Sequence, residues 1–123
     1  MSYPSNHYIL FLQNNYTKQT FVHDVYNQSS DKLFYKFEDF EFDSHAPYGE
    51  YNYALVWCTL EYRVELSNEL LDSKIIVTTS QGEDISLSLK DVVPDTGIVL
   101  YPDPNKINQE QLSLDEKTDF YSL

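Results

Sequence analysis

Residues 49–60 alternate between large and small side chains, a pattern that predicts a strand covered on both faces. Successive residues of a strand point to opposite faces of its sheet. One face would carry large, mostly aromatic side chains: Tyr51, Tyr53, Leu55 and Trp57. The other would carry small, mostly apolar ones: Asn52, Ala54, Val56 and Cys58. Because neither face suits solvent and turn residues Pro47 and Gly49 flank its start, we predict a central strand of a sandwich.

Further segments with alternating or continuous apolar residues predict the remaining strands. Their ranges are 8–13, 19–26, 32–42, 60–66, 74–79, 85–89 and, after a loop over 92–97, 98–101. Within 32–42 the apolar positions change phase near Glu38, which predicts a bulge or bend in that strand. A short helical turn is expected around residues 69–71. The chain is therefore predicted to be all-β, folded as an antiparallel β-sandwich.

The pattern changes at Pro102, where two prolines in three residues forbid continued strand pairing. We expect one domain over residues 1–101 and an extended C-terminal tail over 102–123. The tail is polar with four spaced apolar side chains: Leu112, Leu114, Phe120 and Tyr121. It is either a mobile end or a strap that binds a partner. Together with Tyr3 in the polar N-terminal arm, these four are the candidate partner-binding residues.

The charge of the chain excludes some partners. Twenty acidic and eight basic side chains give a net charge of −12. Binding to phosphates requires basic side chains, so we expect no contact with nucleic acid or with an anionic membrane. An acidic inhibitor of a nucleic-acid enzyme remains an alternative. No apolar run is long enough for a signal peptide or a membrane span, so we expect synthesis in a reducing cytoplasm.

No motif in the sequence predicts catalysis, a cofactor or a metal. The sole cysteine, Cys58, lies in a strand pattern and is expected to be buried. The three histidines lack metal-ligand spacing, and His23 and Asp24 are strand neighbours that point apart. The acidic residues of 38–43 lack the spacing of a calcium loop, and a solvated strand edge is the expected role. We therefore expect a non-enzymatic protein.

The aromatic residues leave another function open. Tyr51, Tyr53 or Trp57 would stack on sugar rings in a module that binds glycans of a host surface. Such a module needs an exposed aromatic platform, whereas most aromatic side chains are buried.

Three parts of the sequence together resemble one protein family. They are YILFLQNNYT at residues 8–17 followed by Phe21, YKF at 35–37 followed by PYGEYNYAL at 47–55, and KTDFY at 117–121. These parts resemble the small Ig-like β-sandwich virion proteins of tailed phages that infect Bacteroidetes, including crAss-like phages. Residues 62–89 depart from that pattern, because the chain there has an extra predicted strand pair.

The resemblance implies an Ig-like sandwich with no chemistry of its own and no cofactor. It implies a virion structural protein, a capsid auxiliary or decoration protein or a head accessory subunit, located in the virion. The partners would be other virion proteins such as the major capsid protein. Which virion protein is bound, and at which position, stays open at this level.

Overall fold

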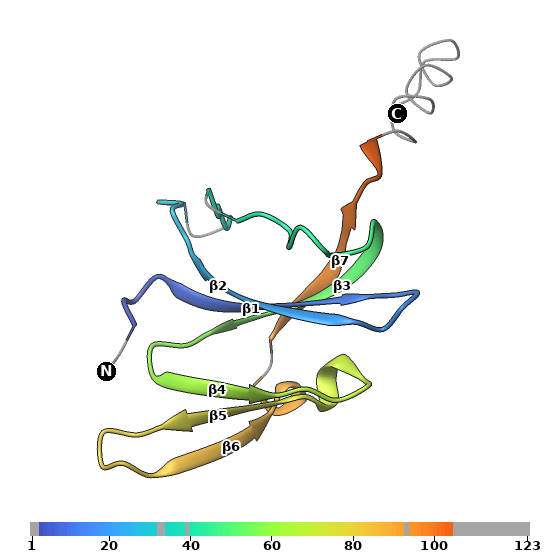
Figure 1. The fold of residues 1–123 in the computed structure, drawn as a ribbon. Coiled ribbons are helices and arrows are strands. Elements are labelled where there is room, and N and C mark those ends of the chain that lie inside the picture. The colour runs from blue at the N-terminus through green and yellow to red at the C-terminus, as the bar shows by residue number, and fades with distance from the viewer. Residues whose placement is uncertain (1–2, 32–33, 39, 93, 105–123) are drawn as a thin grey trace.

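A computed structural model describes residues 3–31, 34–38, 40–92 and 94–104 (Figure 1). Within these residues the chain forms two antiparallel sheets with strand orders β2-β1-β3-β7 and β4-β5-β6. The strands are β1 His7–Asn14, β2 Thr20–Tyr26, β3 Gly49–Trp57, β4 Glu61–Glu65, β5 Lys74–Thr78, β6 Asp84–Ser88 and β7 Asp95–Tyr101. The predicted all-β antiparallel β-sandwich is confirmed as a four-stranded sheet packed on a three-stranded one.

Strand β3 is central in its sheet, as its sequence pattern predicts. It pairs with β1 on one side and β7 on the other, with Leu55 opposite both Leu10 and Asp95. Its small side chains, such as Ala54 and Val56, face the second sheet and are buried. Its larger side chains, such as Leu55, lie on the outer face and are buried there under a second layer.

The core between the sheets joins β1 and β3 to β5. Ile9 and Phe11 are completely buried and pack in one cluster with Ile75 and Val77 of β5. Two short 3-10 turns, η1 Leu70–Asp72 and η2 Leu89–Asp91, close this core with Leu70 and Leu89. The helical turn expected around residues 69–71 is therefore confirmed as η1.

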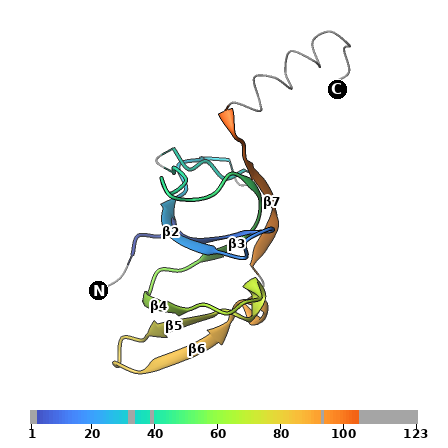
Figure 2. The ribbon, with the colours of Figure 1, turned by 45° about the vertical axis from the view of Figure 1, so that its right-hand side comes forward.

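The segment between β2 and β3 corrects the prediction of a strand over 32–42. Its described residues form no strand and instead lie across the outer face of the four-stranded sheet (Figure 2). Phe37, Phe40 and Phe42 pack there against a cluster that contains Leu12 and Tyr51. Apolar side chains at short intervals suit a covering loop as well as a strand, because each ring can reach the sheet from an irregular backbone.

Two connections link the sheets. The second one is shorter than the loop predicted over residues 92–97. Residues 58–60 carry the chain from β3 to β4, and η2 leads it back from β6 to β7. Strand β7 starts at Asp95, three residues before the predicted start, because polar residues 95–97 still pair with β3. Gly97 leaves room for the Tyr53 ring in this pairing, since a Cβ there would lie 2.8 Å from a ring atom.

Candidate binding surfaces

The N-terminal arm packs against its own domain. The ring of Tyr3 stacks on His7 with centroids 3.9 Å apart and planes 12° apart. Its backbone N–H donates to the Thr59 carbonyl oxygen at 2.8 Å. Tyr3 is thus half-buried, whereas the other predicted partner-binding residues lie outside the described residues: Leu112, Leu114, Phe120 and Tyr121.

Beneath Tyr3, a buried polar cluster connects both sheets. His7 is completely buried, with Nε2 2.9 Å from Asp24 Oδ1 and Nδ1 2.6 Å from the Cys58 carbonyl oxygen. Both ring nitrogens therefore lie within hydrogen-bond distance of an acceptor oxygen. The Tyr62 hydroxyl of β4 donates to the same Asp24 oxygen. Burial and this hydrogen bond raise the pKa of Tyr62.

This cluster was not predicted, because the sequence suggested only His23 as a neighbour of Asp24. In the β1–β2 hairpin His7 lies opposite Tyr26, and Asp24 is two residues from Tyr26 on the same face. Such diagonal neighbours are within reach of long side chains. The hairpin register is the signal that would have paired His7 with Asp24.

His23 lies on the outer face of the sheet. Its ring contacts Phe40 edge-on, with centroids 5.2 Å apart. Its Nε2 atom is buried and, within the described residues, has no hydrogen-bond partner. Burial lowers the pKa of His23, which favours the neutral ring.

The described residues contain no group of three or more His, Cys, Asp or Glu side chains that could hold a metal ion. In the acidic run, Glu38 is exposed and forms an exposed ion pair with Lys36 at 3.9 Å. The sole cysteine is buried, as predicted. Burial raises the pKa of the Cys58 thiol, which favours its protonated and less nucleophilic form.

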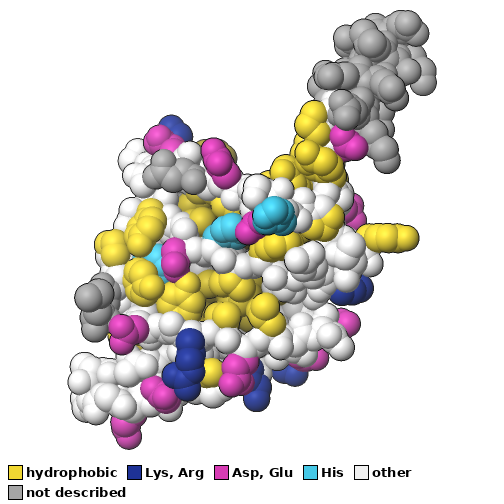
Figure 3. All heavy atoms as spheres, in the orientation of Figure 1, with side chains coloured by type: hydrophobic (Ala, Val, Ile, Leu, Met, Phe, Trp, Pro, Cys, Tyr) yellow, Lys and Arg dark blue, Asp and Glu magenta, His cyan; other side chains and the backbone are white. Residues whose placement is uncertain are grey.

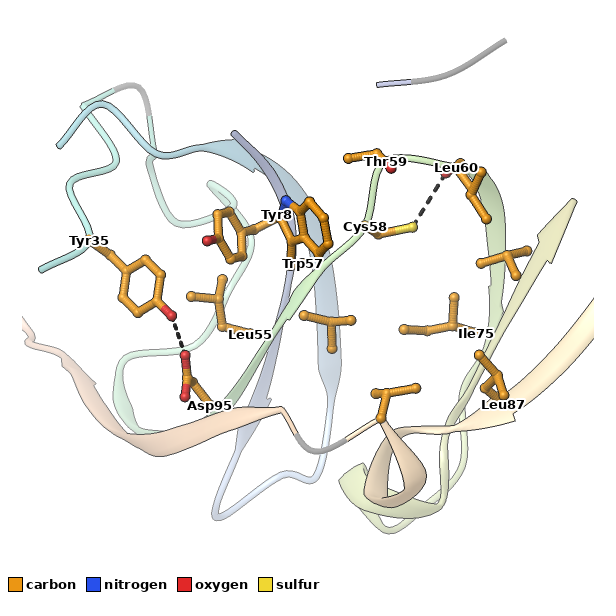
Figure 4. Close-up of a pocket in the computed structure, with 13 residues that line it drawn as sticks. Tyr8, Tyr35, Leu55, Trp57, Cys58, Thr59, Leu60, Ile75, Leu87 and Asp95 are labelled. Carbon is orange, nitrogen blue, oxygen red and sulfur yellow. Dashed lines mark hydrogen bonds between the residues drawn. The ribbon is translucent and has the colours of Figure 1, made fainter. Parts of the chain in front are cut away.

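A cleft of about 600 Å³ lies beside the end of β3 (Figure 4). We call it the Trp57 cleft. Its inner wall comes from both sheets, with Val56 of β3 facing Ile75 of β5. Its rim is apolar and open to solvent, since Trp57 is 60% exposed and Leu60 is 40% exposed. The Trp57 cleft is therefore an apolar hollow with large apolar side chains left in water around it.

Few polar groups line the Trp57 cleft. The Tyr35 hydroxyl donates to the Asp95 carboxylate across its mouth (Figure 4). This hydrogen bond, with a smaller contribution from burial, raises the pKa of Tyr35 to about 12. Asp95 is the single charged side chain among the described residues that line the cleft. The indole of Trp57 is held at the rim by a 2.7 Å hydrogen bond from Nε1 to the Ser5 carbonyl oxygen.

A second apolar surface lies on β7, one of the two outer strands of the four-stranded sheet. Ile98 is 62% exposed and Leu100 is 64% exposed. No charged residue occurs between positions 96 and 101. By contrast, the outer strand β4 carries Glu61 and Arg63, both exposed. Hydrophobic side chains gather where β7 leaves the domain, whereas acidic and basic side chains mix along the three-stranded sheet (Figure 3).

The three aromatic residues considered for glycan binding do not form one platform. Tyr51 is completely buried, and its hydroxyl donates to the Pro47 carbonyl oxygen at 2.5 Å. Tyr53 is half-buried on the same face, over Gly97. Trp57 alone of the three is exposed.

Comparisons with protein-family models, with curated proteins and with solved structures found no match to this chain. Among the described residues, no helix has the length and apolar character needed to cross a membrane. The fold defines the chain as an all-β sandwich, and its two exposed apolar surfaces are the candidate sites.

Proposed function

We propose that the protein is a non-enzymatic structural subunit that binds other proteins in a larger assembly. The observation that carries this proposal is the exposed strand β7, which has no charged residue over positions 96–101 and holds Ile98 and Leu100 in solvent. An outer strand presents unpaired backbone N–H and C=O groups along one side, which can pair with a strand of another chain. Exposed apolar side chains add burial to that pairing.

Strand β7 differs from the outer strand β4 as a binding edge. Natural sheets protect their edges with charged side chains, prolines or bulges. Strand β4 has this protection, with three charged residues in five. Strand β7 has none between positions 96 and 101, and among the described strands it pairs only with β3. An unprotected edge in a chain of high net charge suits a defined partner.

The assembly that we propose is a phage virion, with this chain as a capsid auxiliary or decoration protein or a head accessory subunit. The support for the virion is the resemblance of residues 8–17, 35–37 and 47–55 to virion proteins of that kind. The partner would be another virion protein such as the major capsid protein. Because this chain carries a charge of −12, the partner's contact surface would be neutral or basic.

Quantitative mass spectrometry of purified virions, from a phage that encodes this chain, tests the proposal. We expect a fixed ratio of the chain to the major capsid protein. A variant with Ile98→Lys and Leu100→Lys should be incorporated into virions at a small fraction of the wild-type amount, because the two charges would be buried against the partner. Ile85→Lys on β6 is the matched control, since Ile85 is also exposed, and it should load normally.

Two results would overturn the proposal. The first is the absence of the wild-type chain from virions. The second is unchanged loading of the β7 double variant, with circular dichroism showing that both variants fold.

A further inference from the structure

We propose that the Trp57 cleft binds an apolar segment of a partner protein that carries a lysine or arginine. This inference rests on the proposed function only in taking the ligand to be a protein. The cleft does not include the exposed apolar residues of the β7 surface, Ile98 and Leu100.

We infer that the bound segment is apolar from the residues of the walls and rim of the cleft. The floor is formed by core residues such as Ile75, which is 2% exposed, yet the space above them is open. Trp57 and Leu60 at the rim keep much of their surface in water. A bound apolar side chain would cover both, and tryptophan is enriched among the residues that dominate the energy of protein interfaces.

The shape of the cleft favours a protein over a small molecule. Small-molecule sites enclose most of the surface of their ligand. Here the apolar surface continues from the floor out to the exposed rim side chains (Figure 4). A single apolar side chain would fill the floor, while the segment that carries it would lie across Trp57 and Leu60.

We infer that the bound segment carries a positive charge because Asp95 and the chain as a whole are negatively charged. Asp95 is the one charged side chain that the described lining contains, and it is exposed at the mouth. A carboxylate that accepts one hydrogen bond from Tyr35 retains acceptor positions for an ammonium or guanidinium group. The net charge of −12 also attracts a basic segment and repels an acidic one.

The same charge argument disfavours the chain's own C-terminal segment as the occupant. Residues 105–123 contain two basic side chains, Lys106 and Lys117, and four acidic ones: Glu110, Asp115, Glu116 and Asp119. A segment with more acidic than basic groups would be repelled by Asp95 and by the rest of the domain. The occupant is therefore a segment of another protein.

Trp57 is the only tryptophan, so its fluorescence reports directly on occupation of the cleft. The probes are two synthetic peptides, acetyl-Gly-Leu-Phe-Lys-Gly-amide and the same peptide with Glu in place of Lys. We expect the lysine peptide to shift Trp57 emission to shorter wavelength in a saturable manner. We expect it to bind about three- to fivefold tighter than the glutamate peptide, as for an exposed ion pair.

Three variants locate the binding. Asp95→Asn keeps an acceptor for Tyr35 and should abolish the preference for lysine over glutamate. Leu60→Ala should weaken both peptides equally. Tyr16→Ala, at a residue that is 94% exposed and does not line the cleft, should leave both affinities unchanged. Equal urea midpoints of the variants establish that each is folded.

Each contrary result overturns the inference. Unchanged Trp57 emission with both peptides would show that the cleft takes no such segment, and equal binding of both would remove the role of Asp95. A response to maltotriose or chitotriose in place of the peptides would identify a glycan site. A shift of Trp57 emission on truncation after Pro104 would show that the chain's own tail fills the cleft. All these measurements use the isolated protein, so they fail independently of the virion proposal.

Discussion

Asp24 connects more of the molecule than any other single acidic side chain described above. It accepts hydrogen bonds from His7 of β1 and from Tyr62 of β4, so it links one sheet to the other. Its own side chain is 46% exposed, whereas His7 is completely buried. The energetic weight of the cluster therefore lies with the buried ring, which loses its carboxylate partner if Asp24 is removed.

We predict that Asp24→Ala lowers the free energy of unfolding by about 1–3 kcal/mol, the cost of a buried donor without a partner. The measurement is urea denaturation followed by circular dichroism. Asp72→Ala is the control, because it removes only an exposed ion pair with Lys90, worth about 0–1 kcal/mol. Equal losses in the two variants would mean that Asp24 acts as a surface charge.

His23 gives the fold a dependence on pH. Its pKa is lowered by burial, so in acid the unfolded chain binds a proton at this ring that the folded chain does not. Stability from His23 is therefore complete above the unfolded pKa of about 6.5 and falls as the pH drops below it.

We predict that the free energy of unfolding of the wild type falls more steeply between about pH 7 and about pH 5 than that of His23→Leu. Urea midpoints of both proteins across this range provide the measurement, and the other groups cancel in the comparison. Parallel curves would show that His23 is readily protonated in the folded state.

At the scale of elements, β7 and β3 pack closely at Gly97. Gly97 lies under the ring of Tyr53, where an added Cβ would approach ring atoms to 2.8–2.9 Å. Alanine is otherwise no worse than glycine in a strand. Whether a substitution at position 97 stabilises or destabilises the fold therefore depends on the Tyr53 ring.

We predict that Gly97→Ala costs about 1–3 kcal/mol in the wild type, as overpacking does. In a Tyr53→Ala background the same change should cost much less, because the clashing ring is gone. Chemical denaturation of the four proteins of this double-mutant cycle gives the coupling. If Gly97→Ala lowered stability equally in both backgrounds, the Tyr53 ring would not be the cause of the loss.

The elements also show why one predicted strand failed while its neighbours succeeded. Strand β3 was predictable because both of its faces carry a consistent pattern over nine residues. Around Phe37 and Phe40 the apolar spacing changes, and sequence alone does not show whether such rings belong to a strand or to a cover. The answer depends on the outer face of β1 and β3, which offers Leu10, Leu12 and Tyr51 to the loop.

At the scale of the molecule, the layers follow from the sequence and the surfaces do not. Alternation specifies which residues are inside, and the two clusters on either side of β3 agree with it. Whether an apolar residue such as Trp57 or Ile98 reaches solvent depends on where the opposing layer ends. That boundary is a long-range property, so the β7 surface and the Trp57 cleft became visible only in the structure.

We propose that protein binding takes place at the β7 edge of the sandwich. Hydrogen–deuterium exchange of the chain, free and bound to virion particles, tests this claim most directly. We predict that exchange in residues 96–101 slows strongly on binding, because a partner strand would occupy the open side of β7, while residues 61–65 of β4 are unchanged. Unaltered exchange over 96–101 in the bound state would contradict the account.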